Sequence, residues 1–442
     1  MDHGRRRLLR RKAVGAGIVL ATVGGALAVG SPIAATPISV RYGLNPQLKL
    51  ITTRVPETPL EIRKLVVKPG ASAVPDIAPA ASRYPMYALP SRISANSGAI
   101  AGVNGDFGTK LRQPSHDLMI DGELWTTGQT SGTAIAWSES GRSIYIGRPQ
   151  LRIRARAVPS GTALFDIAEW NAHPPTASRV AAYTSRGGAV TVPPGVANPG
   201  KWDPAWCAAR LEPLSSPRWN GTARTSIVRT YTVSEQPDPC PQTPLDVGTA
   251  PGAVVVASEY SKTVANKVQA LSVGDTVKIA WTYAGWPGVT DVMGAGQMLV
   301  DEGVNVAPPY VTGAPYILNY NPRTAVGIRP GCSDTDTATP CRLFLMTVDG
   351  RQASTDWSMG VRLPHLADLF IESGASMAVN LDGGGSTTMW LRQTDPAYCQ
   401  VFPSVGVGCL VQRPSQTTGE RATRSAFVVL PAADTGAPPR LR

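Results

Sequence analysis

Residues 376–390 read SMAVNLDGGGSTTMW, a short apolar run that meets three consecutive glycines and then a cluster of hydroxyl side chains. Apolar residues bounded by glycine are typical of a buried strand that enters a sharp loop. In such a strand Asn380 and Asp382 point to one side and Leu381 to the other. Glycines let the backbone approach a ligand closely, and successive amides can form a nest for an anion. The stretch predicts a site for a polar ligand; the alternative interpretation is a tight turn.

A second stretch, residues 100–107 (IAGVNGDF), repeats this pattern of an apolar run that ends at glycine. It places Asn104 and Asp106 two positions apart, as Asn380 and Asp382 are. Two strand ends that each carry an amide and a carboxylate favour one shared polar site.

The segment before the first stretch predicts a βαβ-like unit. Residues 343–348 read as a strand that ends at Asp349, and residues 363–373 have apolar residues at helical spacing. Pro364 near the start and Gly374 at the end match the preferences of helix termini. A strand at residues 378–381 follows. If the two strands are parallel, Asp349 and Asp382 emerge at one edge of the sheet, where open α/β sheets bind ligands.

The composition indicates a large globular protein. The chain has 442 residues, of which 43% are hydrophobic and 17% charged, with 44 glycines and 40 prolines. These values predict a sizeable core and many turns, and we expect an α+β fold made of one mixed, strand-rich domain. We divide the chain into a signal peptide (1–35), an N-terminal extension with a strand (36–95), a main domain (96–432) with a loop-rich insertion around 193–250, and a flexible tail (433–442).

The first 35 residues have the features of an export signal. Basic residues precede an uncharged stretch, residues 13–30, which small residues follow. RRRLLR at residues 5–10 also resembles the twin-arginine pattern of bacterial export. We expect a secreted or cell-envelope protein without a transmembrane span once the leader is removed; an uncleaved anchor is the alternative.

The net charge of the chain indicates which kinds of partner it binds. The formal net charge is +11, and about +6 remains without the leader. No RNP-type motif, zinc knuckle or lysine-rich run accompanies this excess, so we expect no nucleic-acid partner. Anionic cell-wall polymers or phosphate-bearing sugars fit the charge better. Four scattered histidines in no HExxH motif argue against a zinc hydrolase.

Six cysteines in an exported chain predict disulfides. Their even number and sequential grouping favour the pairs Cys207–Cys240, Cys332–Cys341 and Cys399–Cys409, although six cysteines allow fifteen connectivities.

Six short motifs together resemble the phosphodiester glycosidase family. They are VNGDF (103–107), PRTAVGI (322–328), VDGR (348–351), NLDGGGSTTM (380–389), RPS (413–415) and GER (419–421), and they occur in the order of the family. Two features depart from its pattern. Phe107 is followed by Gly108 where the family has paired aromatics, and the cysteine-bearing region at 193–250 is an addition.

The resemblance implies cleavage of a sugar-1-phosphodiester to free sugar and a phosphomonoester. It implies that a carboxylate acts as base or nucleophile, and the candidates are Asp106, Asp349, Asp382 and Glu420. The expected substrate-binding residues are Asn104, Arg323, Thr324, Arg351, Asn380, Gly383, Gly384, Gly385, Ser386, Arg413 and Arg421.

Two other function classes compete with this enzyme. The first is a non-catalytic module that binds an anionic cell-wall glycan in the same pocket. The second is a phosphatase or nuclease, which would need a metal cluster with histidines that the chain lacks. We expect no required cofactor and leave open one structural calcium held by loop carboxylates. The sequence predicts no oligomeric state.

Overall fold

The computed structural model describes residues 37–69, 73–109, 113–128, 132–158, 164–172, 179–187, 191–192, 206–236, 245–246, 252–259, 265–308, 319–329, 331–332, 341–352, 354, 356–401 and 407–431. The expected signal peptide, the expected tail at residues 433–442 and Cys240 lie outside these ranges. Among the residues described, no helix is both long enough and apolar enough to cross a membrane.

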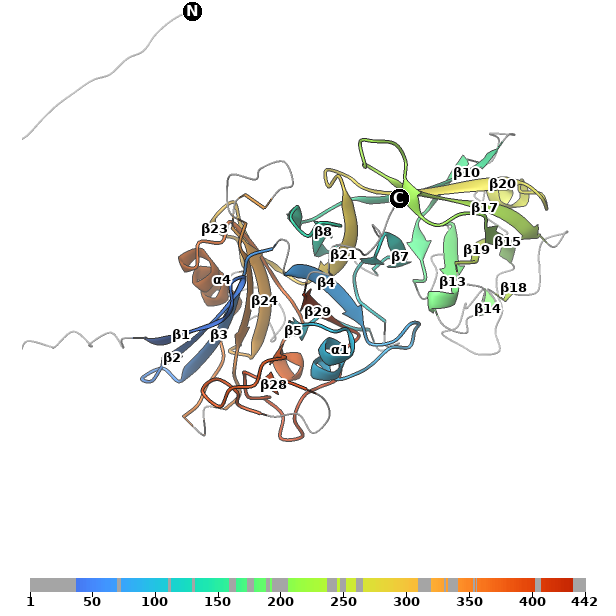
Figure 1. The fold of residues 1–442 in the computed structure, drawn as a ribbon. Coiled ribbons are helices and arrows are strands. Elements are labelled where there is room, and N and C mark those ends of the chain that lie inside the picture. The colour runs from blue at the N-terminus through green and yellow to red at the C-terminus, as the bar shows by residue number, and fades with distance from the viewer. Residues whose placement is uncertain are drawn as a thin grey trace, which may run out of the picture. The chain divides into compact units, whose positions relative to one another are not determined.

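Strands from the first and last thirds of the chain form an eight-stranded sheet (Figure 1). Its order is β1 (Ile38–Asn45), β2 (Leu48–Val55), β3 (Leu60–Val67), β25 (Leu343–Val348), β24 (Arg323–Ile328), β26 (Met377–Asn380), β22 (Met298–Asp301) and β23 (Val304–Asn305). Helix α4 (Leu363–Glu372) packs on one face of this sheet through Leu366, Ala367 and Phe370.

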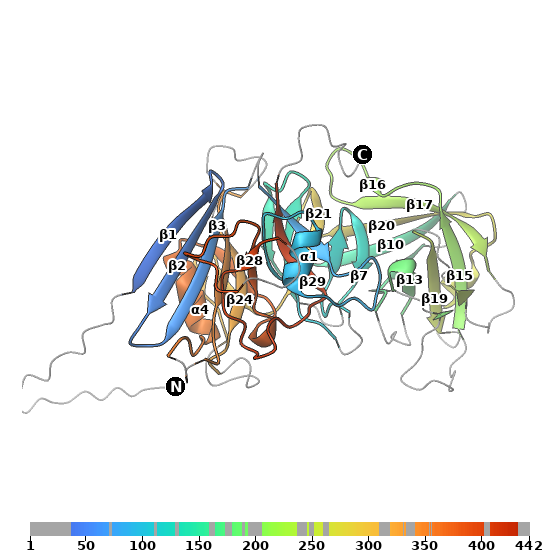
Figure 2. The ribbon, with the colours of Figure 1, turned by 60° about the horizontal axis from the view of Figure 1, so that its bottom comes forward.

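Two five-stranded sheets follow in the middle of the view in Figure 1. One has the order β28 (Cys409–Leu410), β27 (Met389–Leu391), β5 (Ala101–Asn104), β29 (Ser425–Leu430) and β4 (Val74–Pro79). The other has the order β7 (Glu123–Thr126), β6 (Leu118–Ile120), β21 (Val289–Ala295), β8 (Thr133–Ser138) and β9 (Ile144–Gly147). Helix α1 (Pro90–Asn96) packs on the first of them (Figure 2).

The central part of the chain forms a nine-stranded sheet. Its path is β11 (Leu164–Ile167), β10 (Leu151–Val158), β20 (Thr276–Tyr283), β17 (Ile227–Glu235), β15 (Trp206–Pro213), β19 (Val254–Glu259), β13 (Ala181–Thr184) and β12 (Glu169–Trp170), and β16 (Arg218–Trp219) pairs with β17. The short strands β14 (Thr191–Val192) and β18 (Leu245–Asp246) pair with each other, and α2 is Ala265–Gln269. The expectation of a strand-rich fold is confirmed, and the described helices are few.

The two segments that we set apart by sequence contribute to the main sheets. Strand β3, from the expected N-terminal extension, pairs with β25, and β4 pairs with β29. Residues 206–236, in the expected loop-rich insertion, supply β15, β16 and β17. The alternate burial of Ile227, Tyr231 and Val233 explains this regularity, because such alternation buries one face of a strand.

The expected βαβ-like unit has its two strands parallel but not adjacent. Strands β25 and β26 both pair antiparallel with β24, which lies between them, and α4 connects them. The expected helix at residues 363–373 is confirmed, with a proline in the first turn and Gly374 at φ 82° just after its end. Asp349 and Asp382 therefore follow strands that run in one direction.

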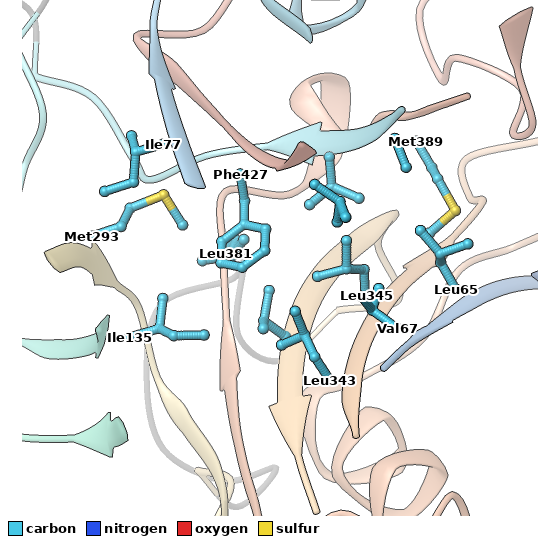
Figure 3. Packing of buried hydrophobic residues seen from close by; sticks show 14 of the residues in the cluster. Leu65, Val67, Ile77, Ile135, Met293, Leu343, Leu345, Leu381, Met389 and Phe427 are labelled. Carbon is cyan, nitrogen blue, oxygen red and sulfur yellow. The ribbon is translucent and has the colours of Figure 1, made fainter. Parts of the chain in front are cut away.

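The main core lies where three sheets meet (Figure 3). Residues from the eight-stranded sheet and from both five-stranded sheets pack together there: Leu65, Val67, Leu343, Leu345, Leu381, Ile77, Met389, Phe427, Ile135 and Met293. Leu381 is fully buried in this core, and burial of such a side chain typically stabilises by about 1.5–3 kcal/mol. This burial holds the neighbouring Asp382 in place at the strand end.

Two of the three expected disulfides are confirmed. Cys332 bonds to Cys341, and Cys399 bonds to Cys409. Cys207 is also disulfide-bonded.

The buried carboxyl of Asp291 in β21 predicts a pH-dependent stability. It accepts hydrogen bonds from the Asp121 amide and the Thr290 hydroxyl (2.9 and 2.7 Å), and burial, followed by the charge of Asp76, raises its pKa to about 8. The folded protein thus holds a proton that the unfolded chain releases, so this group destabilises the fold as pH rises from about 4 to about 8. Asp291→Asn keeps the acceptor for the Asp121 amide and should stabilise the protein by about 4–5 kcal/mol at about pH 8, and by clearly less at about pH 5. Urea unfolding of both proteins at the two pH values checks this, and equal differences at both would contradict it.

Candidate active site

A cavity of about 1020 Å³ is lined by several of the residues that the motifs predict for the site. Segments that follow β5, β25 and β26 line it, together with residues that precede and begin β24. Its charged or titratable lining residues are His116, Arg148, Arg323, Arg351, Asp382 and Arg421. Residues from several of the motifs that we expected to meet at strand ends thus line the same cavity.

Asp382 lies at the wall of this cavity, with 15% of its side chain exposed. Its Oδ2 accepts hydrogen bonds from the Ser386 hydroxyl (2.6 Å) and from the Arg421 guanidinium (3.1 Å). Burial raises the pKa of Asp382, and Asp106 adds to this, whereas Arg421 and Ser386 oppose it. The carboxylate is thus held in a fixed position and is more basic than a carboxylate in water.

Asn104 fixes the backbone under Asp382. Its Nδ2 donates to the carbonyl of Asp382 (2.6 Å), while its Oδ1 accepts from the Thr324 hydroxyl (2.7 Å) and the Thr388 amide (3.1 Å). Both Asn104 and Thr324 are fully buried and are not among the residues that line the cavity. The structure therefore gives them a positioning role beneath the site.

Arg323 and Arg351 concentrate positive charge on one wall. Arg323 is the first residue of β24 and donates to the carbonyls of Val361 and Asn319, both at 3.2 Å. Burial, followed by the charge of Arg351, lowers the pKa of Arg323 to about 10. The Arg351 guanidinium donates to the Asn321 side chain at 2.9 and 3.2 Å. An anion bound beside both guanidinium groups would offset the cost of burying like charges.

The triple glycine packs closely against the turn before β24. A Cβ on Gly383 would lie 2.8 Å from the Pro322 carbonyl oxygen, and Gly384 has φ 61°. The Gly384 amide donates to the Pro322 carbonyl (2.9 Å), so this amide of the expected anion nest is used within the protein. Gly383 and Gly384 line the cavity, whereas Gly385 and Ser386 are buried beside it.

Asp106 holds His116 at the cavity. Its carboxylate lies 2.8 and 3.1 Å from His116 Nδ1 and accepts from the His116 amide (3.2 Å). Burial opposes charge on the ring, but the hydrogen bond and charge of Asp106, with the charge of Asp117, outweigh it and raise the pKa of His116. Because Nδ1 faces Asp106, Nε2 is the ring nitrogen that remains to contact a ligand.

His116 fits there because glycines leave space for it. A Cβ on Gly294 would lie 2.0 Å from His116 Cβ, and one on Gly132 would lie 2.4 Å from His116 Cδ2. Sequence reasoning missed this histidine, since we counted it among four scattered ones. The available signal was its position ten residues after Asp106.

Gln297 was also missed. It lines the cavity, and its side-chain oxygen accepts from Asn380 Nδ2 (3.1 Å). The buried Asn380 therefore does not line the cavity itself but donates a hydrogen bond to Gln297, which does.

Asp349, Arg413 and Glu420 are also not among the residues that line the cavity. Asp349 is buried, accepts from Trp357 Nε1 (2.7 Å) and the Arg413 amide (3.1 Å), and burial raises its pKa to about 6. The Arg413 guanidinium stacks 3.5 Å from the centre of the Trp357 ring. Glu420 accepts from the amide (3.0 Å) and the hydroxyl (2.5 Å) of Ser91 in the first turn of α1. These three side chains thus contact local partners and do not line the cavity.

Within the described part of the chain, no group of three or more His, Cys, Asp or Glu side chains is arranged to hold a metal ion.

Comparisons with known proteins give a fold and a match to one family model. The structure is similar to that of a hypothetical protein from Synechocystis, with a TM-score of 0.63 and 15% identity over 89% of this chain and 64% of that one. It is also similar to a candidate exported protein from Burkholderia pseudomallei, with a TM-score of 0.55 and 20% identity over 84% of this chain and 74% of that one. The chain therefore spans less than two thirds of the Synechocystis protein. At these identities the two likenesses show the fold alone.

A further match is the auto-inhibited catalytic domain of zebrafish N-acetylglucosamine-1-phosphodiester alpha-N-acetylglucosaminidase, at a TM-score of 0.36 and 12% identity over 91% of this chain and 85% of that one. No curated protein matches the chain. The family model of the phosphodiester glycosidases matches residues 230–430, which include five of the six motifs. Residues 230–430 of the chain are therefore similar to the phosphodiester glycosidase family.

Proposed function

We propose that the protein is an exported hydrolase that cleaves a sugar-1-phosphodiester to free sugar and a phosphomonoester, on cell-wall or other extracellular glycans. The observation that carries the proposal is that Asp382 lines one cavity together with Arg323, Arg351 and Arg421. A carboxylate can act at the anomeric carbon, while guanidinium groups bind phosphate oxygens in a fork geometry.

The arginines would hold the phosphate and stabilise the charge that develops on it as the bond breaks. The Arg421 guanidinium contacts Asp382 and has 40% of its side chain exposed, so it can reorient toward a bound phosphate. Arg323 is buried and fixed by two carbonyls, so its charge is already in place. Preorganised charge of this kind is a large contribution to catalysis.

Asp382 would act as base toward a water molecule or as nucleophile. When it acts as base, water attacks the anomeric carbon and gives its proton to Asp382, and the bond from that carbon to the phosphate oxygen breaks. The electron pair of this bond stays with the phosphomonoester. His116, whose pKa is raised by Asp106, would donate a proton or a hydrogen bond to the leaving oxygen. These steps use only protein side chains and water.

Export is supported by the basic and apolar leader and by the two described disulfides, which are typical of oxidising compartments.

A substrate screen tests the proposal. The mature protein is purified and incubated with α- and β-linked sugar-1-phosphodiesters, and the release of free sugar is measured. Turnover of one anomer, with an equal amount of phosphomonoester formed, is the expected result. Absence of turnover with every substrate, beside measurable binding of an anionic glycan, would instead establish a non-catalytic binding module.

Arg351→Gln is expected to lower kcat/KM for the phosphodiester by about 10–100-fold, mainly by raising KM. A charge-assisted hydrogen bond contributes about 1.5–3 kcal/mol, and every 1.4 kcal/mol corresponds to a factor of about ten. Arg413→Gln is the matched comparison, because the family motifs place both arginines in the site whereas only Arg351 lines the cavity. Steady-state kinetics of both variants decide between these views. An equal loss of kcat/KM in both would contradict the role given to the cavity.

A further inference from the structure

Strand β10 carries a row of three arginines. Arg152, Arg154 and Arg156 occupy alternate exposed positions, and the residues between them are buried. Alternate residues of a strand share one face at steps of about 6.6–6.8 Å, so the three guanidinium groups form a regular line.

The neighbouring strand β20 adds to the positive charge of this face. Lys278 of β20 is exposed and lies directly opposite Arg156. The one described acid paired across the row is Asp166 of β11, which forms an ion pair of 3.1 Å with Arg154. The side chains of Arg154 and Asp166 are 61% and 75% exposed, and such exposed pairs contribute little and exchange readily. The row is therefore available to a polyanion.

A groove connects this row to the candidate active site. The groove has a volume of about 740 Å³ and is lined by Arg152 and Arg154. His116, Thr133 and Gln150 line both the groove and the cavity, so the two are continuous. Arg148 lines the cavity, and the chain then runs directly from it into β10, which lies beside β20 in Figure 1. Arginines thus follow a path of about 26 Å from Arg148 to Arg156, at about 3.3 Å per residue.

We propose that this groove and the β10 face bind an extended polymer whose phosphodiester groups repeat along its chain, such as a polymer of phosphate-linked sugars or polyols. Its terminal sugar-1-phosphodiester occupies the cavity, and the following phosphates contact the arginine row. The position of the chain end rests on the proposed function, whereas binding of the polyanion needs no turnover.

The lining of the groove favours this polymer over a single-stranded nucleic acid. Proteins that bind single strands without sequence preference combine cations with aromatic side chains on which bases stack. Among the described residues that line the groove there is no Phe, Tyr or Trp. The groove therefore offers charge and hydrogen bonds but no stacking platform.

Fluorescence anisotropy with labelled oligomers of glycerol phosphate tests the proposal. These oligomers carry repeated phosphodiesters but no anomeric carbon, so the proposed reaction does not consume them. The triple variant R152Q/R154Q/R156Q is compared with R41Q/R83Q/R92Q, which removes the same charge at three exposed positions on other elements. We expect at least tenfold weaker binding for the β10 variant and less than a twofold change for the control. The dependence of log affinity on log salt should also fall by about two, because each phosphate contact on a flexible single strand contributes roughly 0.7 to that slope.

Unchanged binding by the β10 variant, or an equal loss in the control variant, would overturn the proposal. Equally tight binding of a single-stranded oligonucleotide of the same charge would also overturn it, since the surface would then select only charge. Kinetics with a short sugar-1-phosphodiester separate this test from that of the proposed function. Oligomer binding without hydrolysis of any sugar-1-phosphodiester supports the polymer surface and rejects the proposed enzyme. Hydrolysis of the short substrate without oligomer binding rejects the polymer surface alone.

Discussion

Asp382→Asn is expected to lower kcat by a factor of about 10²–10⁴, with a melting temperature close to that of the wild type. Asn has the size of Asp and keeps an oxygen that accepts from the Ser386 hydroxyl, which lies 2.6 Å from the carboxylate. The change removes the group that would take a proton from water or attack the anomeric carbon. Burial raises the pKa of Asp382, so replacing its carboxylate with a neutral amide should cost little stability. Steady-state kinetics with the sugar-1-phosphodiester, together with thermal unfolding, measure both quantities.

Glu420→Gln is the matched control for this prediction. Glu420 is another candidate carboxylate from the C-terminal motifs, but it binds Ser91 at the start of α1. We expect kcat within about twofold of the wild type and a lower melting temperature, because Gln keeps only one of the two oxygens that accept from Ser91. The assignment fails if Asp382→Asn melts early yet turns over normally when folded, or if Glu420→Gln loses kcat instead.

The elements predicted correctly are those with local signals. The strand before Asp382 and the helix at residues 363–373 were visible in apolar spacing and in the proline and glycine at the helix ends. The order of strands in the sheet was not visible. Strand β24 lies between β25 and β26, and β3 pairs with β25 across a long stretch of sequence. Such pairings depend on which surfaces pack together, and a short window of sequence does not contain that information.

The prediction of the site residues was limited in the same way, because short motifs do not show which side chains face one cavity. The motifs predicted Asp382, Arg323, Arg351 and Arg421 at one location, and these four do line one cavity. Arg413 comes from the same group of motifs but stacks on Trp357, because a loop only a few residues long can direct neighbouring side chains to different surfaces.

His116 lines the cavity but belongs to none of the six motifs. It reaches the cavity because Gly294 of β21 and Gly132 leave space for its ring. These residues are far apart in sequence, and only the folded chain brings them together.

His116→Asn is expected to lower kcat by a factor of about 10²–10⁴ without loss of the fold. The Asn amide can take the place of Nδ1–H and still donate to Asp106, which lies 2.8 Å from Nδ1 in the wild type. The substitution removes Nε2, the nitrogen that would donate to the leaving phosphate oxygen. Kinetics and thermal unfolding of the variant, measured as for Asp382→Asn, test this role. A folded His116→Asn variant with wild-type kcat would make His116 a structural residue of the cavity wall.

The Asp106→Asn variant separates positioning from catalysis through the pH profile of kcat. If His116 acts as the acid, activity falls as pH rises through its pKa, which Asp106 holds above the ordinary value of 6.5. Asp106→Asn removes the charge that raises this pKa, while burial, which lowers it, remains. The alkaline limb of the profile should therefore move to lower pH. The loss of kcat should be smaller than in His116→Asn. An alkaline limb that stays in place would show that the group titrating there is not His116, and the acid would have to be another residue of the cavity.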